Sequence, residues 1–223
     1  TGSFDMDHSM DILVFEDLSG YDAVVLNNNC SEGERRDLFW DELGKNGDLT
    51  EQEREKQAAR LEKNLIKFVK RGGGLMVLHG GIVMQNNSME FSKMVGGSFD
   101  YHPPQQEVRV ELVEPDHPLL SCFNGQPFVH VDEPYIFKNA YFDYDFRPLL
   151  SMDASTLHSL KGEIEDPVIY ISWIKRYGKG RVFYVSPSHN VQSFEDTRMI
   201  QFYLDGLQYV TGDLTCDDTP MEP

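Results

Sequence analysis

The chain has few cysteines and few basic residues, and each shortage excludes a class of protein. Its 223 residues include three cysteines, which are odd in number and far apart: Cys30, Cys122 and Cys216. This pattern excludes a full disulfide framework and any Cys-x-x-Cys motif, although a single disulfide stays open. Lys and Arg number 20 against 37 Asp and Glu, which gives a net charge of −17. We therefore expect neither nucleic acid nor a membrane surface as a partner.

Long apolar runs are also missing. No segment approaches the roughly 18 apolar residues of a membrane-spanning helix, and no secretory signal is visible. We expect a cytoplasmic protein, and a periplasmic or secreted one stays open because the sequence begins at Thr1. Without repeats or a low-complexity linker, a chain of this length is expected to form a single domain over residues 1–223.

Several common catalytic motifs are absent as well. There is no Gly-x-x-x-x-Gly-Lys-Ser/Thr phosphate loop and no Gly-x-Ser-x-Gly elbow. The glycines at 72–74 precede a strand rather than a helix, so they do not form a dinucleotide fingerprint. Nucleotide-driven chemistry and elbow-type serine hydrolysis are therefore not expected.

What the sequence does contain is a buried strand that runs directly into a histidine. Residues 75–78 are continuously apolar, which is typical of a strand buried on both faces, and His79-Gly80-Gly81 follow. Ligands of open α/β sheets bind at the carboxyl ends of such strands, and glycines allow a tight turn there. His79 is therefore either a functional residue at the sheet edge or a hydrogen-bonded interior residue.

The elements around this motif predict an α/β fold. Thr50 and Glu53 have the capping-box pattern of a helix start, and the glycine at 72 stops that helix just before the strand. A helix followed by a buried strand is typical of a parallel sheet covered by helices. Further buried strands are predicted at 21–26 and 181–186, the latter in a hairpin with 168–174.

The remaining segments are assigned from their patterns. Alternation predicts a half-exposed strand over 108–112, and the strand-like stretch 128–137 is interrupted by a proline. Short helices are expected at 88–95 and 196–210, the second with Ile200, Tyr203, Leu204 and Leu207 on its apolar face. The strand and helix that usually come first in such a sheet are not apparent in the sequence. Residues 4–14 have the pattern of a helix end followed by an exposed strand, so we expect an N-terminal strand–helix unit to be missing.

A second histidine has the same setting as the first. His189 follows the strand at 181–186, and His102 and Glu133 lie in loop-like segments that could reach the same sheet edge. Two or three imidazoles with a carboxylate suit a zinc-type site, and they equally suit acid–base work near neutral pH. No His-x-x-x-His or His-Glu-x-x-His pair is present, so spacing alone leaves a metal site open.

Polar and aromatic neighbours of these residues are candidates for substrate binding. Asn28 follows the strand at 21–26, where it either lines a ligand site or forms a turn. Tyr135 could stack on a sugar ring or pack in the core. We expect Asn28, His102, Tyr135 and Asn190 to contact the substrate.

Taken in order, these motifs resemble the trehalose-utilisation (ThuA-like) family. The resemblance covers residues 21–212 and is carried by the following segments: 21–26, 68–69, 72–75, 78–80, 95–99 with His102, His117-Pro118, 132–135, 177–184 and Ser188-His189. It implies a three-layer flavodoxin-like fold similar to the class I glutamine amidotransferases, with a mostly parallel sheet and helices on both faces.

The resemblance also bears on activity. The amidotransferases carry a cysteine where this sequence has His79, and Val191 stands where their glutamate is expected after His189. Cysteine-dependent glutamine hydrolysis is therefore not expected, unless Cys30 or Cys122 served as an alternative nucleophile. The family is linked to catabolism of trehalose and related disaccharides, and the resemblance implies a divalent metal (zinc or similar) near His79, Glu133 and His189.

We therefore expect a carbohydrate-catabolism protein that acts on trehalose-like or 3-keto disaccharides by isomerase, lyase or hydrolase chemistry. His79, Glu133 and His189 are its expected catalytic residues and metal ligands. The alternative is a non-catalytic sugar-binding protein that accompanies a sugar dehydrogenase. A homo-oligomer is compatible with both hypotheses.

Overall fold

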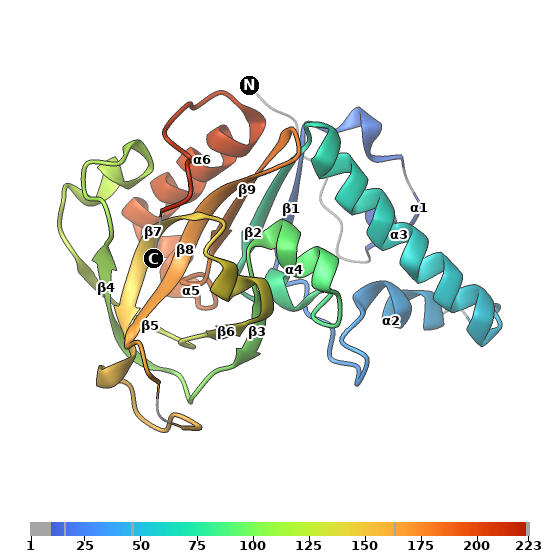
Figure 1. Cartoon of the computed structure of the whole chain (residues 1–223), viewed down its shortest axis with the longest axis horizontal. Coiled ribbons are helices and arrows are strands. Elements are labelled where there is room, and N and C mark those ends of the chain that lie inside the picture. The colour runs from blue at the N-terminus through green and yellow to red at the C-terminus, as the bar shows by residue number, and fades with distance from the viewer. Residues whose placement is uncertain (1–9, 16, 46, 163, 222–223) are drawn as a thin grey trace.

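The computed structural model describes residues 10–15, 17–45, 47–162 and 164–221, and shows an α/β fold built around one large sheet (Figure 1). The helices are α1 (Asp11–Phe15), α2 (Leu38–Gly44), α3 (Glu51–Arg71), α4 (Met89–Val95), α5 (Val191–Glu195) and α6 (Thr197–Thr211). The strands are β1 (Ala23–Asn27), β2 (Gly74–Leu78), β3 (Ser98–Tyr101), β4 (Gln106–Leu112), β5 (Phe128–Asp132), β6 (Ile136–Lys138), β7 (Arg147–Asp153), β8 (Val168–Tyr177) and β9 (Gly180–Val185).

The main sheet has seven strands in the order β1-β2-β9-β8-β7-β4-β5. β1, β2 and β9 pair in parallel, whereas the four remaining pairs, from β9–β8 to β4–β5, are antiparallel. The α/β class is confirmed, but the expectation of a mostly parallel sheet was wrong. The reason lies in the connections: β8 and β9 are joined by a tight turn, which only antiparallel neighbours allow.

Helices cover both faces of the parallel part. β9 places Phe183 and Tyr184 on opposite faces, and the Phe183 ring lies 5.2 Å from that of Phe202 in α6. On the other face, the indole of Trp173 packs against Tyr184 and donates a 2.7 Å hydrogen bond to the carbonyl of Val95, the last residue of α4. Figure 1 shows α4 and α6 on these two sides of β9.

Several local predictions are confirmed. α3 begins at Thr50 with a complete capping box to Glu53 and ends at Gly72, which adopts a positive φ of 126°. β8 and β9 form the predicted hairpin, and the strand-like stretch around Pro134 is divided into β5 and β6. The proline explains that break, because it cannot donate a sheet hydrogen bond.

Two predictions at the ends of the chain were wrong in whole or in part. Residues 11–15 form the helix α1 rather than a strand, and residues 1–9 lie outside the described part. In α6 the predicted apolar face is right in part: Tyr203 is buried and Leu207 packs against the core, but Ile200 and Leu204 are exposed, and Met199 and Phe202 are buried instead. The prediction assumed a single apolar face, whereas α6 carries apolar side chains on more than one side.

Neither a disulfide nor a membrane span is found in the described part of the chain. All three cysteines are free thiols. None of the described helices is both long enough and apolar enough to cross a membrane.

Candidate functional site

The candidate site is built around an elbow at the carboxyl end of β2. β2 is buried along its whole length between β1 and β9, and the chain turns sharply after Leu78. His79 adopts a left-handed backbone conformation, with φ of +43°, which is uncommon for a non-glycine residue. The two glycines that follow allow close packing: a Cβ on Gly80 would lie 2.2 Å from the Cys30 sulfur, and one on Gly81 would lie 2.7 Å from the Leu26 carbonyl oxygen.

The His79 ring is held by hydrogen bonds on both nitrogens. The side chain is 1% exposed, and its Nδ1 lies 2.7 Å from the carbonyl oxygen of Ser186 at the end of β9. A carbonyl can only accept, so Nδ1 carries a proton. Nε2 lies 3.2 Å from Oε2 of Glu133. Nε2 is therefore the His79 atom that faces Glu133, where it can donate a hydrogen bond to the carboxylate or bind a cation.

Glu133 lies where three imidazoles meet. It follows β5, and its Oε2 is 3.7 Å from His102 Nε2 and 3.7 Å from His189 Nδ1, in addition to the contact with His79. The hydrogen bond with His79 lowers the pKa of the Glu133 carboxyl, and the charges of His102, His189 and His79 lower it further, while burial raises it. Glu133 is therefore ionised at neutral pH.

The structure thus brings together the four residues that the sequence placed on separate segments. His189 and His102 have side chains 40% and 35% exposed, so one side of the site opens to solvent. His102 is fixed by a 2.8 Å hydrogen bond between its Nδ1 and the Pro103 carbonyl, which leaves Nε2 directed to Glu133. The same tautomer is therefore set at His79 and at His102 by a backbone carbonyl.

The other predicted substrate-binding residues have structural partners. The Asn28 side-chain oxygen accepts a 3.2 Å hydrogen bond from the backbone N–H of Gly80, so Asn28 supports the elbow. Tyr135 is buried, with its ring 4.1 Å from that of His79 and stacked on His102 at 5.8 Å. The Asn190 side chain donates a 2.7 Å hydrogen bond to the Val131 carbonyl. These are contacts within the protein, and the substrate-binding role of the three residues stays a prediction.

Sequence reasoning missed two buried residues next to the site. Asp132 and His130 are not among the site residues predicted from the sequence. Asp132 Oδ1 lies 3.9 Å from His79 Nδ1, and His130 Nε2 lies 3.3 Å from Asp132 Oδ2. The only available signal was the spacing along β5, where alternate residues 130 and 132 share one face.

The donor set fits a divalent metal ion. One atom each from His79, Glu133 and His189 lie within 4.8 Å of one another. Ligands of a tetrahedral zinc at about 2.0–2.1 Å are separated by about 3.3 Å, which is close to the His79–Glu133 distance of 3.2 Å. The carbonyl behind His79 provides the outer hydrogen bond that metal-binding histidines usually have. Three protein ligands with an exposed side are also the pattern of a catalytic rather than a structural site.

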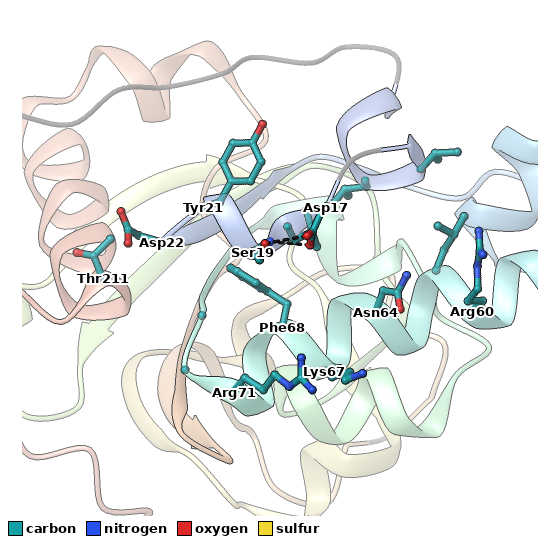
Figure 2. Close-up of a pocket in the computed structure, with 16 residues that line it drawn as sticks. Asp17, Ser19, Tyr21, Asp22, Arg60, Asn64, Lys67, Phe68, Arg71 and Thr211 are labelled. Carbon is teal, nitrogen blue, oxygen red and sulfur yellow. Dashed lines mark hydrogen bonds between the residues drawn. The ribbon is translucent and has the colours of Figure 1, made fainter.

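A larger cavity lies at the opposite end of β1 and β2. Its volume is about 700 Å³, and Figure 2 shows it lined by Tyr21 and Asp22 ahead of β1 and by Lys67 and Arg71 of α3. None of the candidate residues lines it. Since ligands of open α/β sheets bind at the carboxyl ends of the strands, the His79 cluster is the better candidate despite its smaller space.

Solved structures with the same fold support this architecture. A putative ThuA-like protein from Bacteroides uniformis matches with a TM-score of 0.62 and 19% identity over 92% of this chain and 75% of that one. A putative ThuA-like protein from Parabacteroides merdae matches with a TM-score of 0.58 and 16% identity, over 93% of this chain and 75% of that one. A cytoplasmic protein from Salmonella typhimurium matches with a TM-score of 0.56 and 17% identity, over 91% of this chain and 78% of that one. No curated protein matches the chain.

Fold and site together define an α/β protein with a histidine at the elbow position after a central parallel strand. The family model for ThuA, described as trehalose utilisation, matches residues 1–210. The chain belongs to the ThuA family.

Proposed function

We propose that this chain is a metal-dependent enzyme of carbohydrate catabolism that acts on trehalose-like or 3-keto disaccharides. The grouping of His79, Glu133 and His189 supports the metal most strongly, because one possible ligand atom from each lies within 4.8 Å of the others. The family description, trehalose utilisation, supports a sugar substrate.

His79, Glu133 and His189 would hold the ion. When bound, a divalent cation acts as a Lewis acid on a carbonyl or hydroxyl oxygen of the substrate. The ionised Glu133 supplies the negative charge that such a cation needs, and the carbonyl of Ser186 keeps Nε2 of His79 free to bind it. The exposed side of the cluster, at His189 and His102, is where the sugar would approach.

His102 is placed to move a proton. Its Nδ1 donates to the Pro103 carbonyl, so its Nε2, 3.7 Å from Glu133 Oε2 on the solvent side of the site, is the nitrogen that can exchange a proton. In a 3-keto sugar the protons next to the carbonyl are acidified, so their removal by a base would start isomerisation or elimination. We assign this proton transfer to His102, and we assign Tyr135 to holding the His79 and His102 rings in place.

Metal analysis of the purified protein tests the proposal. We expect about one zinc-like ion per chain in the wild type and its loss in His79→Ala, with His158→Ala, an exposed histidine outside the cluster, as the matched control. Turnover of a 3-keto disaccharide should fall at least 100-fold in His79→Ala and in Glu133→Ala. Unchanged turnover in both variants would show that the cluster is not the reaction centre.

The same measurements separate the enzyme from a sugar-binding protein. Calorimetric binding of a disaccharide without product formation under any metal condition would favour the accessory role beside a sugar dehydrogenase. Retention of activity after thiol alkylation would remove the remaining hydrolase alternative, in which Cys30 or Cys122 is the nucleophile.

A further inference from the structure

A buried carboxylate connects the segments that carry the candidate ligands. Asp132 is the last residue of β5 and is 4% exposed. Its Oδ1 accepts a 2.8 Å hydrogen bond from the backbone N–H of Glu133, and its Oδ2 accepts one of 3.4 Å from the backbone N–H of His189. Burial of a carboxylate is costly unless it is hydrogen-bonded or paired, so this arrangement indicates a specific role.

That role follows from the sheet topology. Glu133 leaves β5, which is paired only with β4 at one edge of the sheet, whereas His189 follows β9 near its centre. In the part of the chain that the structure describes, no strand pairing joins these two segments. The hydrogen bonds from the His189 N–H to Asp132 and from Asn190 to the Val131 carbonyl join the end of β5 to the segment after β9, beside the contact between Glu133 and His189.

The ring of His130 lies next to the Asp132 carboxylate. Its Nε2 lies 3.3 Å from Asp132 Oδ2 and 2.9 Å from the hydroxyl of Ser193 at the start of α5. The three residues resemble a Ser-His-Asp triad in type, but both contacts are made by the same ring nitrogen, whereas a triad uses both. Ser193 is fully buried, and the adjacent cavity is only about 10 Å³, about the size of one water molecule. No substrate can therefore reach this group.

We propose that Asp132, held by His130, is a positioning residue that fixes Glu133 and His189 as ligands of the metal ion. The inference rests on the proposed function, since it concerns the same metal site. It adds a specific dependence: the affinity for the ion is set by a residue that does not touch it. Outer hydrogen-bond partners of ligands typically contribute 10- to 100-fold in metal affinity.

Zinc titration of Asp132→Asn tests the inference. The amide keeps an acceptor for the Glu133 N–H but places an NH₂ group where Oδ2 accepts from His189. We expect zinc to bind 10- to 100-fold more weakly, with a changed visible spectrum of the cobalt-substituted protein. Asp205→Asn is the matched control, because Asp205 is also buried and its carboxylate accepts from Gln201 of the same helix. That variant should bind zinc as the wild type does.

The His130 variants provide a second readout that does not depend on Asp132→Asn folding. His130→Leu removes the ring nitrogen that lies 3.3 Å from Asp132 Oδ2 and should weaken zinc binding, whereas His130→Gln, whose amide nitrogen can take the place of Nε2, should restore it. A wild type that binds no metal would overturn the proposed function itself. If the wild type binds zinc and the Asp132→Asn and His130→Leu variants bind it equally well, the positioning role is wrong while the metal site stands.

Discussion

The elbow that carries His79 can be tested by replacing Gly80 with alanine. Gly80 does not need glycine for its φ angle, so the effect comes from space alone. The new Cβ would lie 2.2 Å from the Cys30 sulfur and 3.1 Å from Oδ1 of Asn28. A comfortable carbon contact is about 3.5–4.0 Å, so the overlap with sulfur is more than about 1 Å.

The cost of this overlap can be bounded. Inserting a methyl group into a well-packed region typically destabilises a protein by about 1–3 kcal/mol. For a chain of this size that corresponds to roughly 2–12 °C in Tm, since 1 kcal/mol shifts it by about 2–4 °C. Removing the Cys30 sulfur should relieve the clash, so Gly80→Ala combined with Cys30→Ala should be less destabilised than the sum of the two single variants.

Urea unfolding of the four proteins in this cycle gives the coupling free energy directly. We expect a favourable coupling of about 1–2 kcal/mol, within the range for residues in contact. Gly81→Ala is the control, because its Cβ would meet the backbone oxygen of Leu26 at 2.7 Å, which no side-chain truncation at Cys30 can relieve. Additive free energies in the Gly80–Cys30 cycle would refute the packing argument for the elbow.

Three further predictions concern the rest of the fold. Thr50→Ala should destabilise the protein by about 1 kcal/mol in urea unfolding, because it removes the capping box of α3; an equal midpoint for wild type and variant would contradict this. Burial lowers the pKa of the His117 imidazole below its usual 6.5, so the stabilising contribution of neutral His117 is complete above pH 6.5 and is lost as the pH falls through the folded-state pKa. The Tm of His117→Asn should therefore fall less steeply than that of the wild type over this pH range. Burial raises the pKa of the three cysteine thiols to about 11. At pH 8 the thiols should therefore be alkylated on the order of 10- to 100-fold more slowly in the native than in the unfolded protein, and equal rates would contradict their burial.

The elements next to the elbow were predictable because their signals are local. A continuous apolar run predicted β2, and the turn at 177–180 predicted the β8–β9 hairpin. The same hairpin, together with the alternating pattern of β4, already indicated antiparallel pairing. The expectation of a mostly parallel sheet came from the family resemblance and from the helix–strand order around β2, and parallel pairing is found there, between β1, β2 and β9.

The site was predictable in part. His79 and His189 follow buried strands, so their meeting at one edge could be expected from topology. The positions of Glu133 and His102 depend on how the small β3–β6 sheet folds over that edge, which no spacing in the sequence encodes. Asp132 could not have been assigned its role, because it acts on backbone N–H groups, and these carry no sequence signal.

The wide separation of the site residues along the chain also has a consequence for folding. His79 and Glu133 are 54 positions apart, and they come from opposite sides of the junction between the parallel and antiparallel parts of the sheet. Because closing so long a segment costs chain entropy, we expect this contact to form late in folding. An ion at this site would therefore bind to an already folded sheet rather than nucleate it. A chelator should remove the metal and leave the protein folded, whereas small zinc domains unfold when their ion is removed.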